Sequence, residues 1–263
     1  MSQKPFFVTI PHSGEKIPDL TPWLLNLSEP MLMRDVDRYV DVLYEDSIKS
    51  LFLPLVKTEW HRYAVDLNRL PQDIDQSSVI GATHVKGFER GFHWSMTTYK
   101  EKLIQQPMSI DTHTQLRNLI YEPFHKQVKE MYIKLRAETG KQSIYHLDLH
   151  SMPSLGTSMH LDPGEIRADI VISDSNQRSC ARSFRDLVIA AYVTAGFKVG
   201  YNWPYKGGRL TEEYGKPQEG QHVLQVEMNR ALYMNEETKK LNPDYKNVSE
   251  KLKKALAYVK DNL

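Results

Sequence analysis

The sequence predicts a single α/β domain with a largely parallel sheet and helices on both faces. Two observations lead to this fold class. Short apolar runs of strand length alternate along the chain with segments in which apolar residues recur at helical spacing. The chain has 263 residues, which is long enough to bury a sizeable core, and it contains no repeats or low-complexity segments.

The first strand is expected at residues 6–10, a continuous apolar run with the length and composition of a buried strand. Ser28 and Pro30 indicate a helix start, and apolar residues then recur at helical spacing through residue 44. A long helix is predicted over 111–139, ended by Gly140, with a kink possible at Pro123. Further strands are expected at 53–60, 143–151, 169–172, 197–201 and 222–228, and further helices at 179–195 and 248–263.

Residues 71–93 are rich in Gly, Asp, Gln and Ser and show little periodicity. This composition predicts an irregular excursion or a lid and not a linker between independent domains. Residues 1–263 are therefore expected to form one domain.

Composition and charge exclude several classes of partner. The chain has 34 Lys and Arg against 33 Asp and Glu, a net charge of +1, so no overall field favours nucleic acid or an anionic membrane. No stretch approaches the ~20 apolar residues of a membrane span, and the N-terminus lacks the pattern of a secretory signal. The single Cys180 cannot form an internal disulfide, which fits a reducing compartment. A cytoplasmic protein is expected.

Polar side chains gather at or beside the expected ends of strands. In α/β sheets ligands bind beyond the carboxyl ends of strands, so these positions are candidates for a site. The clusters are His12 with Glu15, Arg62 with Asn68 and Arg69, Asp148 with His150, and Glu227.

These residue types fit the chemistry of a mononuclear zinc hydrolase. Zinc in hydrolases usually keeps three protein ligands from His and carboxylate and leaves one position for water, whose pKa falls to about 7. His12, Glu15 and His150 supply that number of ligands. Glu227, a glutamate in an apolar strand, could take the proton of the water and hand it to the leaving amine.

The remaining candidates could bind and orient. Arg62 could polarise the scissile carbonyl, Asn68 and Arg69 could clamp a substrate carboxylate, and Asp148 could orient a metal ligand. The loop after residue 201 adds Asn202, Gly207 and Gly208 as substrate-binding candidates, with the glycines letting backbone approach a ligand.

Several residues also have simpler interpretations. Asp66 and Arg69 might pair with each other in a loop, and His146 is expected to be packed or at a pocket edge. Asp35, Asp37 and Asp41 lie among arginines on an expected helix, for which a solvated face is the default.

Five separated motifs occur in order over most of the chain and resemble those of the N-formylglutamate amidohydrolase family. They are PHSG at 11–14, RYAVDLNR at 62–69, DLHSM at 148–152, NWPYKGG at 202–208 and QVEMNRALY at 225–233. The family is related to aspartoacylase and to zinc carboxypeptidase-like hydrolases. One departure is RLTEEYG at 209–215, where an aromatic and a basic residue are expected before Tyr-Gly, and it bears on the acyl or side-chain specificity.

The resemblance implies a three-layer α/β/α sandwich with a mixed sheet, of the phosphorylase/hydrolase-like kind, and one zinc ion per chain. It also implies cleavage of a small N-acyl amino acid, with formate and glutamate as the products of the family's named enzyme in histidine degradation. By position, the metal ligands fall on His12, Glu15 and His150, the clamp on Asn68 and Arg69, the polarising arginine on Arg62 and the catalytic glutamate on Glu227.

Two alternatives remain open at this stage. A carboxypeptidase-like hydrolase could use the same clamp for a peptide terminus, and a wide open groove would favour it. A binding or regulatory protein could keep the fold without turnover.

Overall fold

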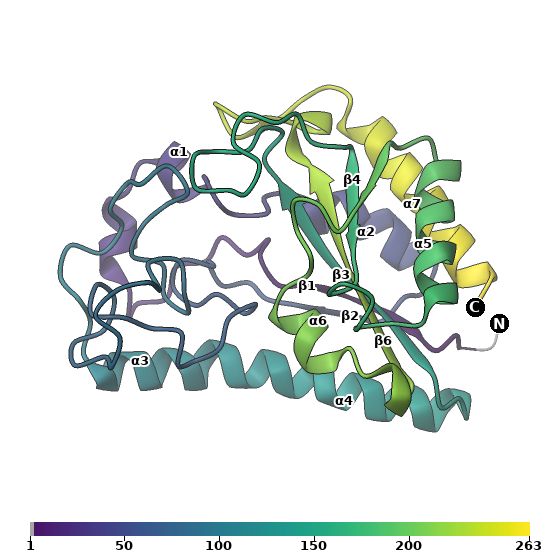
Figure 1. Cartoon of the computed structure of the whole chain (residues 1–263), viewed down its shortest axis with the longest axis horizontal. Helices are drawn as coiled ribbons and strands as arrows, with labels where there is room; N and C mark the ends of the chain where they lie inside the picture. Colours follow the sequence, from purple (N-terminus) through teal and green to yellow (C-terminus); the bar gives the residue numbers. More distant parts are fainter. Residues whose placement is uncertain (1–2) are drawn as a thin grey trace.

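The computed structural model describes residues 3–263 and contains a six-stranded sheet with helices on both faces (Figure 1). The strand order is β2-β1-β3-β6-β4-β5. The strands are β1 (Phe6–Ile10), β2 (Leu55–Lys57), β3 (Ile144–Met152), β4 (Ile170–Ser173), β5 (Val199–Tyr201) and β6 (Gln221–Asn229), and a small hairpin is formed by β7 (Met234–Asn235) and β8 (Lys240–Leu241). The predicted α/β class with a mixed, mostly parallel sheet is confirmed.

Strand direction decides where a site can form. The strands β2, β1, β3 and β6 run parallel, whereas β4 is antiparallel to β6 and parallel to β5. The carboxyl ends of four neighbouring strands therefore meet at one edge of the sheet. The segments that follow β1 and β2 and the last residues of β3 and β6 converge at this edge.

Two helical layers cover the sheet. The helices are α1 (Glu29–Leu32), α2 (Val40–Ser50), α3 (Ile110–Leu116), α4 (Glu122–Thr139), α5 (Arg182–Thr194), α6 (Arg209–Tyr214) and α7 (Tyr245–Asp261). One apolar core joins Val8, Leu147 and Val226 of the sheet to α2, α5 and α7, and a second joins Phe7 and Val223 to α4 and α6. Within residues 3–263, no helix is both long enough and apolar enough to cross a bilayer.

The face of the sheet toward α4 changes character along the strands. Side chains alternate between faces with a period of two, so His146, Asp148 and His150 of β3 share the face of Phe7. Parallel pairing of β3 with β6 places Glu227 beside His150. This face is apolar under α4 and polar at the carboxyl edge.

The long helix predicted over 111–139 is present but is not uniform. A π-helical segment, Arg117–Tyr121, separates α3 from α4, and Pro123 lies in the first turn of α4. Proline lacks the N–H that would close an α-helical hydrogen bond to residue 119, which accounts for an irregular turn at this point. Gly140 ends α4 with a left-handed φ of 64°, as predicted.

The helix predicted from Ser28 through residue 44 is wrong in its middle. The short α1 ends at Leu32 and α2 begins at Val40, and the segment between them is irregular. This turn directs Asp35 and Asp37 inward, where they are 3% and 1% exposed. The expectation of a solvated acidic face is therefore wrong for both residues.

Buried neutral histidines make the stability of the fold sensitive to acid. Burial is the main cause that lowers the pKa of His61 and of His146 to about 4 and that of His93 to about 3. Between pH 6.5 and 4 these histidines bind protons in the unfolded chain but stay neutral in the folded chain. The free energy of unfolding therefore falls as the pH falls. In this range each histidine lowers the free energy of unfolding by roughly 1.4 kcal/mol for each pH unit of acidification.

We expect the free energy of unfolding, measured with urea, to fall steeply between pH 6.5 and 4.5. The variant His61→Gln should reduce this slope by about one proton, and His84→Gln, at an exposed position, should leave it unchanged. Equal slopes in the wild type and in His61→Gln would contradict the burial argument.

Candidate active site

A cavity of about 180 Å³ opens at the carboxyl edge of the parallel strands. It is lined by residues from the segments that follow β1 and β2, from the turn between α1 and α2, and from the ends of β3 and β6. Its charged lining residues are His12, Asp35, Asp37, Arg62, Arg69, Arg90, His150, His160, Glu227 and Arg230. The cavity is therefore strongly polar and carries both signs of charge.

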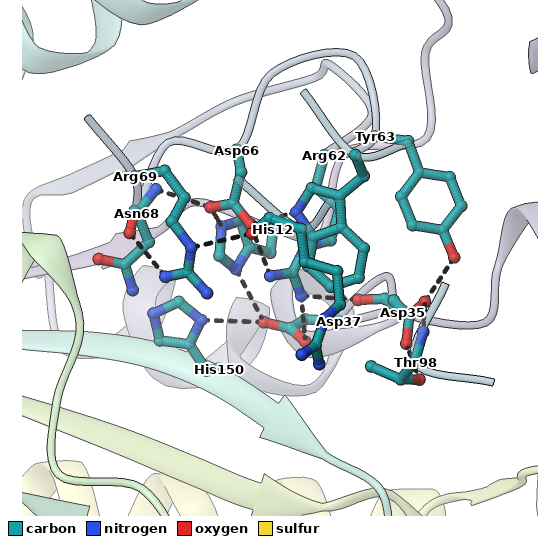
Figure 2. A network of polar contacts seen from close by, with 12 residues as sticks. His12, Asp35, Asp37, Arg62, Tyr63, Asp66, Asn68, Arg69, Thr98 and His150 are labelled. Atoms are coloured by element: carbon teal, nitrogen blue, oxygen red, sulfur yellow. Dashed lines mark hydrogen bonds and ion pairs between the residues drawn. The ribbon is translucent and has the colours of Figure 1, made fainter. Parts of the chain in front are cut away.

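Three buried side chains form a candidate metal centre in this cavity. One ligand atom from each of His12, Asp37 and His150 lies within 4.8 Å of the other two. Asp37 Oδ2 lies 3.5 Å from His12 Nδ1 and 2.9 Å from His150 Nδ1. Figure 2 shows both imidazoles directed toward the Asp37 carboxylate.

Local structure fixes the position of each of these residues. His12 follows β1 directly after Pro11, and its carbonyl accepts a 3.0 Å hydrogen bond from the Asp37 backbone N–H. Gly14 lets this loop lie against the segment after β2, because a Cβ there would approach the carbonyl carbon of Glu59 to 2.4 Å. His150 is held in the middle of the sheet, near the end of β3.

Carboxylates hold the outer nitrogens of both imidazoles. His12 Nε2 donates to Asp66 Oδ1 at 2.8 Å, and His150 Nε2 donates to Asp148 Oδ2 at 2.8 Å. A carboxylate behind a histidine fixes the tautomer and makes the other nitrogen a better metal ligand. Both Nδ1 atoms are thereby prepared to face a cation.

The third member of the cluster is held in the same way. Arg230 Nη2 donates to Asp37 Oδ1 at 3.0 Å, which leaves Oδ2 directed toward the two histidines. His12 Nδ1 is buried and has no hydrogen-bond partner among the described residues. A buried nitrogen lone pair that accepts no hydrogen bond, next to a carboxylate oxygen, is an arrangement of donor atoms that suits a metal ion.

The charges of the cluster depend on one another. Burial opposes ionisation of Asp37, but the neighbouring imidazoles of His12 and His150 and the charge of Arg62 hold its pKa well below the usual range. Burial likewise opposes protonation of His150, but Asp148 and Asp37 raise its pKa well above the usual value. The cluster thus attracts positive charge, from a proton or from a metal ion.

A chain of hydrogen bonds extends from Asp148 into the core toward α4. Thr9 Oγ1 donates to Asp148 Oδ1 at 2.7 Å and accepts from His146 Nε2 at 2.8 Å. The Tyr132 hydroxyl then donates to His146 Nδ1 at 3.0 Å. This direction of donation keeps Asp148 as an acceptor for the Nε2 proton of His150, and His146 is packed, as expected.

Glu15 does not join the cluster. Its carboxylate pairs with Arg38 at 2.8 Å and its side chain is 42% exposed. His12 and Glu15 lie on an extended loop, so their side chains diverge and do not converge on one metal position. The structure thus replaces the expected His12–Glu15–His150 set with His12, Asp37 and His150.

Glu227 lies beside the cluster on β6, in register with His150 of β3. It is 7% exposed, and Oε1 accepts a 2.8 Å hydrogen bond from Gln225 Nε2. Burial and the neighbouring charge of Asp37 raise the pKa of this carboxyl group above its ordinary value. A raised pKa suits a group that must both accept and release a proton.

The residues after β2 line the opposite part of the cavity. Arg62 donates to Asp66 Oδ2 at 2.8 Å and stacks on Trp94, with its charge 4.6 Å from the ring centre. Asn68 accepts from the Leu210 backbone N–H through Oδ1, and its amide nitrogen donates to no group of residues 3–263. Arg69 donates to two backbone carbonyls and has no carboxylate partner among the described residues. Asp66 therefore contacts His12 and Arg62, and the simpler alternative, an ion pair between Asp66 and Arg69, is not found among the described residues.

Gly208 is required by the close approach of Asn68. A Cβ at Gly208 would lie 2.2 Å from Asn68 Nδ2. We expect Gly208→Ala to displace the Asn68 amide and to raise the KM for an N-acyl amino acid about 10-fold, with little change in zinc content. Gly200→Ala on β5 is the matched control, because its nearest new contact is 3.4 Å. An unchanged KM for Gly208→Ala would contradict a role of Asn68 in binding.

Asn202 lies outside the cavity lining. Its side chain bonds to the backbone N–H and the carboxylate of Asp174, at 3.1 and 2.9 Å. Because β5 runs antiparallel to β6, its carboxyl end lies away from the cavity, and the returning chain reaches the cavity at Tyr205, Gly207 and Gly208. The expectation that Asn202 contacts substrate is not supported by this geometry.

Fold and site together define the class of protein. An α/β sheet that carries two histidines and an aspartate at its carboxyl edge, with a buried glutamate alongside, has the side chains of a metal-dependent hydrolase. The family model for N-formylglutamate amidohydrolase matches residues 4–234. The chain belongs to the N-formylglutamate amidohydrolase family.

Individual relatives agree with this assignment. N-formylglutamate deformylase of Pseudomonas aeruginosa is 27% identical over 237 residues, covering 89% of this chain and 83% of the relative. The Pseudomonas putida protein of the same name is 27% identical, covering 88% and 82%. The crystal structure of N-formylglutamate amidohydrolase from Ralstonia eutropha JMP134 matches with a TM-score of 0.85 and 26% identity, over 100% of this chain and 96% of that one.

Several residues of the site were not selected from the sequence, among them Asp37, Asp66, Arg90 and Arg230. Asp66 and Arg230 lie inside the motifs at 62–69 and 225–233, so the motifs could have identified them as site residues. Asp37 and Arg90 lie outside all five motifs, in an irregular turn and in the 71–93 segment.

Proposed function

We propose that the protein is a zinc-dependent amidohydrolase that cleaves N-formyl-L-glutamate to formate and L-glutamate. The observation that carries this proposal is the cluster of His12, Asp37 and His150 beside Glu227, in a cavity with two arginines that lack carboxylate partners. Membership of the family and the names of the relatives support the substrate. The same reaction would place the protein in histidine degradation.

The donor set fits zinc. Two imidazole nitrogens and one carboxylate oxygen form a donor set that zinc commonly takes in catalytic sites, with one position left open. His12 Nδ1, Asp37 Oδ2 and His150 Nδ1 would hold the ion. When bound, zinc would supply Lewis acidity at the amide carbonyl and would make a neighbouring water more acidic.

The surrounding residues would carry out the proton transfers and the binding. Glu227 takes a proton from the attacking water as the C–O bond forms, and it delivers that proton to the amide nitrogen as the C–N bond breaks. Arg62 stabilises the negative charge that develops on the carbonyl oxygen, because its guanidinium is fixed at the cavity wall. Asn68 and Arg69 hold the α-carboxylate of the substrate.

Cavity size favours this reaction over peptide hydrolysis. A volume of about 180 Å³ lies below the ~300–1,000 Å³ of pockets that take drug-sized ligands, so a small N-acyl amino acid fits better than a peptide terminus. A binding protein without turnover is a weaker candidate, because a buried glutamate with a raised pKa adjoins the metal ligands.

The test is a substrate screen of zinc-loaded protein. N-formyl, N-acetyl and N-succinyl derivatives of Glu, Asp and neutral amino acids are compared with short peptides by release of the free amine. Preferential hydrolysis of N-formyl-L-glutamate is expected. Faster cleavage of peptides would favour the carboxypeptidase-like alternative, and no hydrolysis of any compound would contradict the proposal.

A further inference from the structure

Two of the guanidinium groups that line the cavity make no ion pair with any carboxylate in the described part of the chain. Arg69 follows β2, and Arg90 belongs to the irregular 71–93 segment, and both line the cavity. Arg69 Nε donates to the backbone carbonyl of Arg90 at 3.2 Å, which joins the two segments. Two positive charges that share one partly buried cavity are unfavourable unless an anion lies between or beside them.

The Arg90 side chain has no partner of its own. Across residues 3–263, no hydrogen bond or ion pair within the protein involves its guanidinium, whereas Arg62 and Arg230 pair with Asp66 and Asp37. Burial is the main cause that lowers the pKa of Arg90, and the charge of Arg69 lowers it further, although the charge of Asp35, which also lines the cavity, opposes both. A bound carboxylate would relieve both effects.

The 71–93 segment holds Arg90 in a defined place even though it contains no helix or strand. The buried carboxylate of Asp75 accepts the Phe88 backbone N–H at 2.7 Å. On the other side of Arg90, the Phe92 N–H donates to the Asp73 carbonyl at 2.7 Å, and Gly91 permits this approach because a Cβ would lie 2.1 Å from that oxygen. The segment thus presents a fixed cation to the cavity, which is what selective binding of a charged group requires.

We propose that Arg90 is the receptor for the side-chain carboxylate of the substrate and sets the preference for an acidic amino acid. This inference rests on the proposed function, in which Arg69 holds the α-carboxylate common to all N-acyl amino acids. A substrate with two carboxylates needs two cationic groups, and Arg90 is the second one in the cavity without a carboxylate partner. The specificity would then depend on the 71–93 segment and not only on residues 209–215.

The test compares N-formyl-L-glutamate with N-formyl-L-glutamine, which has the same shape and a neutral side chain. Arg90→Gln should lower kcat/KM for the glutamate derivative about 10- to 100-fold, mainly through KM, and leave the glutamine derivative unchanged. Arg69→Gln should lower kcat/KM for both substrates equally. Lys86→Gln, the same loss of charge at an exposed position of the same segment, should change neither.

Equal losses on both substrates in Arg90→Gln, or no loss on either, would overturn the assignment. Calorimetric binding of the product L-glutamate against L-glutamine separates this inference from the proposed reaction, because it needs no turnover. If the wild type hydrolyses neither substrate but binds L-glutamate selectively through Arg90, the proposed reaction is refuted and the role of Arg90 in binding the side-chain carboxylate is supported. If the wild type shows neither hydrolysis nor selective binding, the receptor is refuted as well.

Discussion

Replacing Glu227 with glutamine should reduce kcat for N-formyl-L-glutamate by about 10²- to 10⁴-fold, while KM and zinc content change little. The amide of glutamine has nearly the same shape, but it cannot take the proton of a water molecule. Glu227 contacts none of the three proposed zinc ligands through a hydrogen bond, so the metal should remain bound. The measurement combines steady-state formate release with elemental analysis of the purified variant.

The matched control is Glu219→Gln, the same substitution at an exposed glutamate just before β6. It should keep the wild-type rate. If Glu227→Gln also keeps the wild-type rate, Glu227 is not the proton acceptor. Loss of zinc in Glu227→Gln would instead point to a role in holding the metal.

Replacing Asp37 with alanine should weaken zinc binding by more than about 100-fold and abolish hydrolysis, whereas Glu15→Ala should retain both. The reason is geometric. Asp37 Oδ2 lies among the histidine Nδ1 atoms, but the Glu15 carboxylate is paired with Arg38 near the surface. Competition with a chromogenic zinc chelator measures the affinity of each variant directly.

The pair of variants decides between two ligand sets, because both remove one carboxylate from the same region. Retention of zinc in Asp37→Ala together with its loss in Glu15→Ala would restore the sequence-based set. The loss of the buried pair with Arg230 could also destabilise Asp37→Ala. Asp37→Asn, which keeps the hydrogen-bonding shape, serves as a second variant and should show the same loss of affinity.

The fold was predictable because its signals are local. Apolar runs such as residues 6–10 and the glycine at 140 that ends α4 identify elements without any knowledge of distant contacts. The reversal of β4 against β6 was not visible in the same way, since strand direction is decided by how connections pack, and only the resemblance implied a mixed sheet. That reversal explains why Asn202 lies outside the cavity.

The site was predictable where a side chain sits on or directly after a regular strand. His12 follows β1, while His150 and Glu227 lie on neighbouring paired strands, so sheet geometry brings them together. Asp37 was missed because helical spacing of apolar residues continued across a turn that breaks the helix. Such a turn is fixed by tertiary contacts, here the bond from the Asp37 N–H to the His12 carbonyl.

The two cavity arginines of the further inference, Arg69 and Arg90, show the same limit of prediction from sequence. Arg69 lies in a motif and was selected as a clamp, but Arg90 lies in a segment with no periodicity and no motif. Its position depends on hydrogen bonds made by Asp73 and Asp75, which sequence patterns do not indicate.

The most direct test of the account is a zinc titration of metal-free protein, followed by formate release from N-formyl-L-glutamate. The metal-free protein is expected to hydrolyse nothing, and the rate of formate release is expected to rise linearly with added zinc and to reach its plateau at one zinc ion per chain. Full activity without metal, or no activity at any zinc concentration, would contradict the proposal that His12, Asp37 and His150 form the centre of a zinc amidohydrolase.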